Sequence, residues 1–453
     1  MPAAPPVVHG HCEPAFEPLR GALSDILAAG SEIGAALAVY VDTHAVVDVW
    51  AGHTDAARTR PWERDTIVNL YSVGKAVTAI CALRLVDSGA LDLDAPISRY
   101  WPEFSQAGKA QMPVRFLLTH QAGLPAVARP LPPGAVLRWE IMTDALAAQA
   151  PWWPPGAGHG YHVNTQGFLL GEVVRRITGK TLGSYLRDEI AGPAGIEFFV
   201  GLPPELDGRC ADMVPPPPSP EGDELRRQLS VDPASLSGLA LMRVHAYRNP
   251  PEISGTGIIN TRRWRAAEVP STNGHGNARG VARLYSALAG DGELDGVHIL
   301  SREIIAMAIA EQVYAEDMVL QRPTRFGLGF QLTMAERRLG PSPRAFGHFG
   351  AGGSLGFADP DARLAFGYAM NQGRAGWQHK HVRHLIDLVY KHGGPRDGPP
   401  YPPAFGAPRR SRDAPLRPVD TGGQRSERPG GAVTLLYVPL TRGASVRSAR
   451  AEP

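Results

Sequence analysis

SVGKAVTAICALRLVD, residues 72–87, is the stretch of this 453-residue chain that decides its fold. Apolar residues fill most of its positions and no helix breaker occurs before Gly89, so the pattern predicts a largely buried helix. Ser72 and Lys75 stand three residues apart at its start. That spacing places the serine hydroxyl and the lysine amine on one helical face, within hydrogen-bond reach of each other.

Ser72 and Lys75 have the chemistry of a nucleophile and its base. A serine hydroxyl is a weak nucleophile at neutral pH, and a lysine among apolar neighbours has a lowered pKa and can accept its proton. The positive field of a helix N-terminus favours an oxyanion, to which the Ser72 N–H can donate. An S-x-x-K sequence also arises by chance where a capping serine precedes a solvated lysine. A helix with almost no polar face does not suit that interpretation.

Three further segments follow in order along the chain. Residues 117–124 read LLTHQAGL, residues 160–165 read GYHVNT and residues 348–350 read HFG. With the S-x-x-K tetrad, they resemble the motifs of the serine β-lactamase and penicillin-binding-protein superfamily, and most closely those of its esterase branch, the family VIII carboxylesterases. The similarity extends from about His11 to His392.

The resemblance implies three catalytic side chains. Ser72 would be the nucleophile, Lys75 its proton acceptor, and Tyr161 a second acid and base that passes the proton to the leaving group. The sequence departs from the family at the tyrosine, because the usual Tyr-x-Asn is one residue longer here and ends at Asn164. The role of Asn164 is therefore open, whereas that of Tyr161 is unaffected.

The resemblance also implies the opposite wall of the site. His348 and Gly350 would line it, and the N–H groups of Ser72 and Ala351 would be the two oxyanion donors. His348 replaces the lysine that the superfamily ordinarily uses to hold a substrate carboxylate, which favours esters over carboxylate-bearing substrates. Trp152, Trp153 and Asn164 are candidates for a substrate pocket.

A competing motif occurs at residues 352–356, which read GGSLG and match the G-x-S-x-G nucleophile elbow of α/β-hydrolases. An elbow needs a strand before the serine and a helix directly after it, but Ser354 is followed by a short apolar piece and a turn. We therefore reject Ser354 as the nucleophile. His120, His162 and His275 are interpreted as hydrogen-bonded structural residues rather than general bases.

The expected fold class is α/β (α+β), with the β-lactamase/transpeptidase-like arrangement of a mixed antiparallel sheet flanked by helices. Helical patterns occupy residues 15–29, 278–289 and 377–391 and recur within a helical region inserted at about 90–260. Strands are predicted at residues 36–41, 46–50, 326–334, 345–349, 354–358 and 363–370.

Segment composition suggests two regions. Residues 1–392 are expected to form the catalytic domain, and residues 393–453, rich in Pro, Arg and Gly, a disordered tail. Residues 203–251 contain a proline run and few periodic signals, so they are expected to be a surface excursion or a partial lid.

Composition limits the partners. A net charge of +2 with scattered Lys and Arg does not indicate a nucleic-acid-binding surface. No run approaches the ~20 apolar residues of a membrane span. Three cysteines without metal-ligand spacing predict free thiols rather than disulfides or zinc. The N-terminus shows no signal-peptide pattern, so the expected location is the cytoplasm. No metal or cofactor is implied, and the oligomeric state is left open.

The expected reaction is hydrolysis of a small ester, most simply a short-chain acyl ester, through an acyl-Ser72 intermediate, with weak β-lactam hydrolysis beside it. The alternatives within the superfamily are a β-lactamase, a D-aminopeptidase or an acyltransferase. A catalytically silent binding protein of the same fold is a further alternative, although the presence of Ser72, Lys75 and Tyr161 speaks against it.

Overall fold

The computed structural model describes residues 5–248, 258–374 and 379–393, all of them within one compact unit, Met1–Ala404. Most of the predicted tail, 394–453, lies outside the described residues, so the division into domain and tail stays a prediction. The three cysteines, all of them described, are free thiols as expected. Among the described residues, every helix is too short or too polar to cross a membrane.

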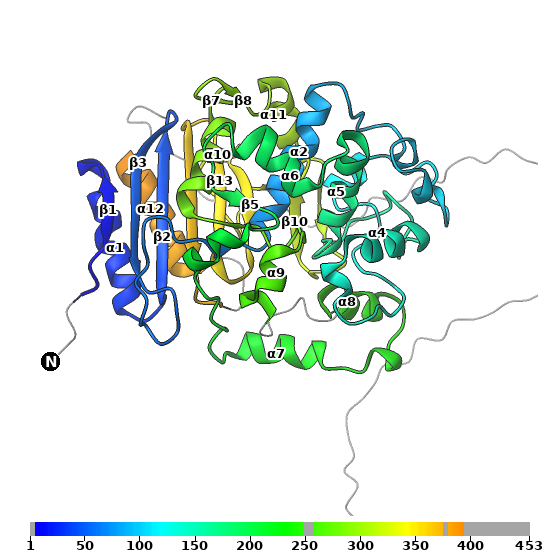
Figure 1. Ribbon diagram of the computed structural model, residues 1–453, viewed down its shortest axis with the longest axis horizontal. Helices are drawn as coiled ribbons and strands as arrows, with labels where there is room; N and C mark the ends of the chain where they lie inside the picture. The colour runs from blue at the N-terminus through cyan, green and yellow to red at the C-terminus, as the bar shows by residue number, and fades with distance from the viewer. Residues whose placement is uncertain (1–4, 249–257, 375–378, 394–453) are drawn as a thin grey trace, which may run out of the picture. The chain divides into compact units, whose positions relative to one another are not determined.

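An antiparallel sheet forms the centre of the described unit (Figure 1). Within the described residues it has nine strands in the order β1-β3-β2-β14-β13-β12-β11-β10-β9. Strands from the beginning and the end of the chain therefore meet in its middle, where β2 pairs with β14. The strands are β1 His9–Cys12, β2 Gly34–Val41, β3 His44–Gly52, β9 Val313–Glu316, β10 Pro323–Phe326, β11 Gln331–Leu332, β12 Phe346–Phe349, β13 Leu355–Asp359 and β14 Leu364–Met370.

Helices cover both faces of this sheet (Figure 1). α1 packs against β3 and α12, whereas α10 packs on β2, β13 and β14. The α10 contact is close because Gly367 faces it: a Cβ there would lie 2.2 Å from the Ala278 carbonyl oxygen. The helices are α1 Glu17–Ala28, α2 Val73–Asp87, α3 Arg115–Leu118, α4 Trp139–Ala148, α5 Thr165–Thr178, α6 Leu182–Leu186, α7 Pro220–Leu229, α8 Gly238–Arg248, α9 Arg262–Ala266, α10 Ala278–Ala289, α11 Arg302–Ile309 and α12 Lys380–Gly393.

Two small sheets complete the described structure. β4 Val68–Asn69 and β5 Phe198–Phe199 both pair with β6 His275–Gly276, and β7 Glu293–Leu294 pairs with β8 Val297–His298. The first of these small sheets positions the predicted nucleophile, because β4 leads directly into residues 70–72, which contain Ser72 and which we call the nucleophile turn. The predicted antiparallel sheet flanked by helices is therefore confirmed.

The structure corrects two local predictions. The strand predicted at 326–334 is a hairpin, in which Phe326 pairs with Gln331 across a turn that contains Gly329 at φ +82°. The excursion predicted at 203–251 contains α7 and α8, although its last residues lie outside the described ranges. α8 is not simply a surface element, because it buries Met242 and Ala246 in an apolar cluster that includes Tyr161.

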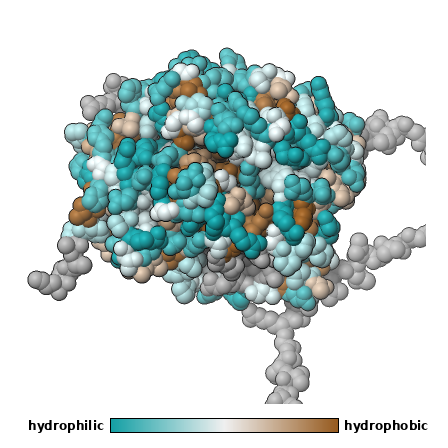
Figure 2. All heavy atoms as spheres, in the orientation of Figure 1, coloured by the Kyte–Doolittle hydropathy of each residue, from teal (hydrophilic) through white to brown (hydrophobic). Residues whose placement is uncertain are grey.

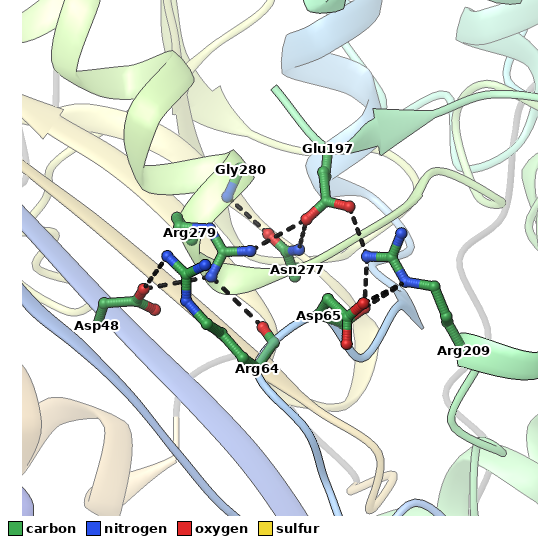
Figure 3. A network of polar contacts seen from close by, with 8 residues as sticks. All are labelled: Asp48, Arg64, Asp65, Glu197, Arg209, Asn277, Arg279 and Gly280. Atoms are coloured by element: carbon green, nitrogen blue, oxygen red, sulfur yellow. Dashed lines mark hydrogen bonds and ion pairs between the residues drawn. The ribbon is translucent and has the colours of Figure 1, made fainter. Parts of the chain in front are cut away.

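Charged residues tie the sheet to the helical side of the unit (Figure 3). Arg279, near the start of α10, contacts Asp48 of β3 at 3.2 Å and Glu197 at 3.1 Å. Glu197 also accepts hydrogen bonds from Asn277 and Arg209. This network fixes the start of α10 against both β3 and the segment that precedes β5.

Most large apolar side chains lie in the core. The face of the molecule shown in Figure 2 is mainly hydrophilic, with apolar residues in small scattered groups. Among the described residues, the large hydrophobic side chains that are exposed are Val7, Val231, Leu239 and Tyr314.

Candidate active site

Ser72 is held at the start of α2 by a strained turn. Tyr71, directly before it, has φ +48°, a left-handed backbone conformation that costs about 1 kcal/mol or more for a residue with a Cβ atom. One residue earlier, the Leu70 N–H donates to the Gly274 carbonyl at 2.7 Å. The chain therefore turns sharply from β4 into α2, and Ser72 is only 7% exposed.

Lys75 lies beside Ser72 and is fully buried. Its Nζ is 3.1 Å from Ser72 Oγ, 2.7 Å from the Val163 carbonyl oxygen and 3.0 Å from the Ser271 carbonyl oxygen. Gly74 allows the start of α2 to lie close to the segment that contains Ser271, because a Cβ there would lie 2.3 Å from the Pro270 carbonyl oxygen. The two residues predicted to act as nucleophile and base are thus in hydrogen-bond contact.

The three contacts of Lys75 determine how its neutral form is oriented. Burial lowers the pKa of Lys75 well below its ordinary value, which favours the neutral amine. A neutral amine has two N–H groups and one lone pair, and the carbonyls of Val163 and Ser271 can only accept hydrogen bonds. With both N–H groups directed to these carbonyls, the lone pair faces the Ser72 hydroxyl.

Tyr161 is the third predicted catalytic residue, and the structure brings it to the same place. Lys75 Nζ lies 4.7 Å from the centre of its ring. Burial raises the pKa of Tyr161, and a hydrogen bond with Ser72 acts against that rise. The Tyr161 backbone N–H donates to both carboxylate oxygens of Asp317, at 3.1 and 3.0 Å. Tyr161 is therefore a protonated phenol at neutral pH and is fixed through its main chain.

Histidines surround Tyr161, and their hydrogen bonds fit the structural role predicted for them. His162 donates from Nδ1 to the Gly160 carbonyl at 2.7 Å and accepts the Leu124 N–H at Nε2 at 3.1 Å. His120 accepts the His162 N–H, and its ring lies 4.9 Å from the Tyr161 ring. Burial lowers the pKa of His162 to about 3 and that of His120 well below its ordinary value.

His275 is also structural, because its Nδ1 donates to the Asn273 carbonyl at 2.6 Å within the small sheet. Burial lowers its pKa to about 4. Within the described residues, no group of three or more His, Cys, Asp or Glu side chains is arranged to hold a metal ion.

β12 supplies the opposite wall of the site. His348, at 1% exposure, has its ring 6.1 Å from the Tyr161 ring. Its Nδ1 donates to the Phe349 carbonyl at 2.8 Å, so Nε2 carries the lone pair, and no described residue bonds to that nitrogen. Burial, together with the nearby Lys75, lowers the pKa of His348 to about 3. His348 therefore presents a neutral acceptor rather than a cation.

The two predicted oxyanion donors come from the two walls. Ser72 begins α2, and Ala351 begins the turn that follows Gly350 after β12. Neither N–H donates a hydrogen bond to another described residue. Gly350 lies against the nucleophile turn, since a Cβ on it would be 2.4 Å from the Leu70 carbonyl oxygen.

Ser354 does not form a nucleophile elbow. β13 starts at Leu355, so a strand and not a helix follows the serine, as the sequence predicted. The Ser354 hydroxyl is buried and donates to the Leu70 carbonyl at 3.0 Å.

The three candidate pocket residues have different surroundings. Trp153 packs in the apolar cluster around Tyr161, with Trp152 at the edge of that cluster. Asn164 does not bond to Lys75: its amide donates to the Ala246 carbonyl at 3.0 Å and accepts from Thr272 at 3.1 Å. Asn164 thus connects α8 to the site.

Sequence reasoning missed Val163, Ser271 and Asp317. Val163 and Ser271 hold Lys75 through their carbonyl oxygens, which every residue type possesses, so no sequence signal marks them. Asp317 is a buried carboxylate in a loop whose sequence matches none of the recognised motifs.

A family model described as "Beta-lactamase" matches residues 19–391. The chain belongs to the beta-lactamase family. It is 32% identical over 379 residues to the esterase/beta-lactamase LipL of Mycobacterium tuberculosis, and the match spans 81% of this chain and 83% of LipL.

Solved structures agree with membership of the beta-lactamase family. A family VIII carboxylesterase superposes with a TM-score of 0.77 at 38% identity, covering 85% of this chain and 99% of the other. A penicillin-binding protein homolog from Caulobacter crescentus also has a TM-score of 0.77, at 35% identity and the same coverages. The chain is therefore a beta-lactamase-fold hydrolase with esterases among its similar structures.

Proposed function

We propose that this protein is a serine carboxylesterase that cleaves small, neutral acyl esters through an acyl-Ser72 intermediate. The observation that carries the proposal is His348. A buried, neutral nitrogen lone pair stands where the superfamily ordinarily has a carboxylate-binding lysine. A lone pair repels a substrate carboxylate and offers it no counter-charge, so the site suits neutral esters better than penicillins or peptides that end in a carboxylate.

The acylation step uses Ser72 and Lys75 at the start of α2 together with the Ala351 N–H from the opposite wall. Ser72 Oγ attacks the ester carbonyl carbon while its proton passes to the lone pair of Lys75. The carbonyl oxygen becomes an oxyanion, and the N–H groups of Ser72 and Ala351 donate to it. The apolar surroundings that keep Lys75 neutral also strengthen these donations, because the local dielectric constant is low.

Tyr161 completes acylation. When the tetrahedral intermediate collapses, the C–O bond to the alcohol breaks and the phenol of Tyr161 gives its proton to the departing oxygen. The protonated Lys75, next to the Tyr161 ring, returns a proton to the phenolate. Water then attacks the acyl-Ser72 ester with the same groups in reverse roles, which releases the carboxylic acid and restores Ser72.

The names of similar proteins support an ester substrate. LipL carries the name esterase/beta-lactamase, and the superposed family VIII protein is called a carboxylesterase. The apolar cluster that contains Tyr161 and Trp153 supports an apolar acyl group. Weak β-lactam hydrolysis is compatible with the same acyl-enzyme chemistry.

The test is hydrolysis of p-nitrophenyl butyrate and of a chromogenic cephalosporin by the wild type and by Ser72→Ala. Ser286→Ala is the matched control, since it removes a buried serine hydroxyl from α10. We expect ester hydrolysis in the wild type and the control, and a loss of about 10³-fold or more in Ser72→Ala. Mass spectrometry should find the trapped acyl group on Ser72.

Three results would contradict the proposal. A wild type that hydrolyses the cephalosporin but not the ester is a β-lactamase, and one that hydrolyses neither does not have the proposed activity. Full ester hydrolysis by Ser72→Ala would remove Ser72 from the chemistry.

A further inference from the structure

The turn from Gly350 to Ser354, which we call the Gly350–Ser354 turn, is closed on itself by main-chain hydrogen bonds. The Gly350 N–H donates to the Ser354 carbonyl at 2.7 Å, and the Gly353 N–H to the Gly350 carbonyl at 3.3 Å. Gly352 and Gly353 have backbone φ angles of +85° and +125°, which residues other than glycine rarely adopt. These bonds restrict the conformation of the turn, which contains Ala351.

Ser354 fastens this turn to the nucleophile turn. Its hydroxyl, completely buried, donates to the Leu70 carbonyl oxygen at 3.0 Å. The two turns touch so closely that a Cβ on Gly350 would lie 2.4 Å from the Leu70 carbonyl oxygen. Leu70 is itself fixed, because its carbonyl also accepts the Val73 N–H at 3.2 Å.

The bond between Ser354 and Leu70 joins the segments that carry the two oxyanion donors. Leu70 is two residues before Ser72, and Ser354 is three residues after Ala351. Among the described residues, this side-chain bond is the one that ties the Gly350–Ser354 turn to the main chain of the nucleophile turn. We propose that Ser354 is a positioning residue that sets the spacing of the Ser72 and Ala351 N–H groups for the oxyanion.

This inference rests on the proposed acyl-Ser72 chemistry and adds a residue to it. Donors of an oxyanion act only when they already lie about 3 Å from the place where the negative charge develops. A displacement of about 1 Å can reduce the rate about 100-fold, because binding of the substrate does not correct it. The G-x-S-x-G sequence at 352–356 thus supports the nucleophile without containing it.

The experiment compares Ser354→Ala with Ser286→Ala, whose hydroxyl donates to the Arg283 carbonyl at 2.8 Å inside α10. We would measure kcat and KM for p-nitrophenyl butyrate, the inhibition constant of butylboronic acid, and the midpoint of thermal unfolding. A boronic acid forms a tetrahedral adduct with a serine and tests the oxyanion donors directly. If Ser354→Ala does not fold, Ser354→Cys, which keeps a weaker donor, takes its place.

We expect Ser354→Ala to lower kcat about 10- to 100-fold with KM changed less than about threefold, and to weaken boronic acid binding by a similar factor. Ser286→Ala should lose comparable thermal stability and keep its kcat and its boronic acid affinity. Acylated peptide from Ser354→Ala should still carry the label on Ser72.

Equal kcat and boronic acid affinity in the two variants would overturn the positioning role while leaving the proposed function intact. A label on Ser354 in the wild type would overturn both. Loss of activity in Ser354→Ala together with full activity in Ser72→Ala would do the same.

Discussion

Asp317 accepts the backbone N–H of Tyr161 with both of its carboxylate oxygens, at 3.1 and 3.0 Å. The same carboxylate accepts the N–H groups of Val319 and Leu320 and the hydroxyl of Thr324. A buried carboxylate with this many donors holds the residue that is proposed to protonate the leaving group.

Asp317→Asn should therefore reduce both stability and activity. One acceptor oxygen is replaced by an amide N–H group that faces other N–H groups, so we expect a loss of about 2–4 kcal/mol in the free energy of unfolding. kcat should fall about 10-fold or more. Urea unfolding and ester kinetics measure the two effects.

A double mutant separates a direct effect on Tyr161 from general damage. In a Tyr161→Phe background, Asp317→Asn should lower kcat less than about twofold further, because residues that act as a unit are not additive. Independent, multiplicative losses would mean that Asp317 does not act through Tyr161.

Replacement by methionine should mainly affect stability at one buried lysine, Lys109, and mainly affect activity at the other, Lys75. Lys109 Nζ donates to the carbonyls of Gln106, Ala147 and Gln149, which need three N–H groups and therefore an ammonium ion. Burial lowers the pKa of Lys109 to about 8, so it is still mainly protonated at pH 7. Lys109→Met should cost about 3 kcal/mol or more, with kcat of the folded protein unchanged.

Lys75→Met should lower kcat about 10³-fold, since the proposed proton acceptor of Ser72 is lost. Its stability loss should be smaller than that of Lys109→Met, because two carbonyls rather than three lose their donor. Chemical unfolding and ester kinetics of both variants test the contrast. Activity loss in Lys109→Met equal to that in Lys75→Met would contradict it.

The pH dependence of kcat/KM should reflect Lys75 rather than a histidine. In the proposed mechanism the deprotonated amine is the active form, so activity should rise with pH through the lowered pKa of Lys75. The pKa of His348 is about 3, so this histidine stays neutral over the assay range. His348→Gln should therefore leave this acid limb of the pH profile unchanged. A shift of that limb would show that His348 titrates there.

His348→Lys should change which substrates are preferred. A hydrogen bond to a charged group contributes about 1.5–3 kcal/mol, so the ratio of cephalosporin to ester kcat/KM should rise about 10- to 100-fold. His348→Gln is the neutral control. An unchanged ratio would mean that position 348 does not discriminate against carboxylates.

Glu197→Gln should weaken the network of Figure 3. Burial pushes the pKa of Glu197 upward, but hydrogen bonds from Arg209 and Asn277 and the charges of Arg209 and Arg279 outweigh it, so the pKa is lowered. A carboxylate with a lowered pKa in the folded state stabilises it above its unfolded pKa, and that contribution is lost as pH falls through the folded pKa.

We therefore expect Glu197→Gln to cost about 1–2 kcal/mol near pH 7 and much less below about pH 4. Urea unfolding at the two pH values measures this. Glu103→Gln is the control: Glu103 pairs with Arg176 at the surface, where its side chain is 56% exposed, and should cost under about 0.5 kcal/mol. A Glu197→Gln effect that does not depend on pH would exclude the charged network as its cause.

The sequence was sufficient to predict those helices and strands in which a regular apolar pattern is present. The helix at 72–87, the strands at 36–41 and 46–50 and the helix at 278–289 are present, because each buries a regular apolar pattern. Ser72, Lys75 and Tyr161 could be predicted to form one site because their motifs occur in the order found in the family that the sequence resembles.

The failures also have physical causes. Apolar residues continue through 326–334, so the hairpin is revealed only by its glycines, which permit the turn at Gly329. α7 consists mainly of polar residues and is preceded by prolines. It therefore lacks the apolar stripe that marks a buried helix. The carbonyls of Val163 and Ser271 become visible only when the chain is folded around Lys75.

The pairing of β2 with β14 has a consequence for the way the protein is made. Seven residue pairs join strands whose residues are more than 320 positions apart, from Val41 with Leu364 to Ala35 with Met370. On the ribosome, β2 can pair with β3 at once, but its other edge stays unpaired until residues 364–370 have been synthesised. Such long-range pairing slows folding and leaves apolar strands exposed to aggregation. Dependence on chaperones during translation should therefore exceed that of a protein with sequential strands.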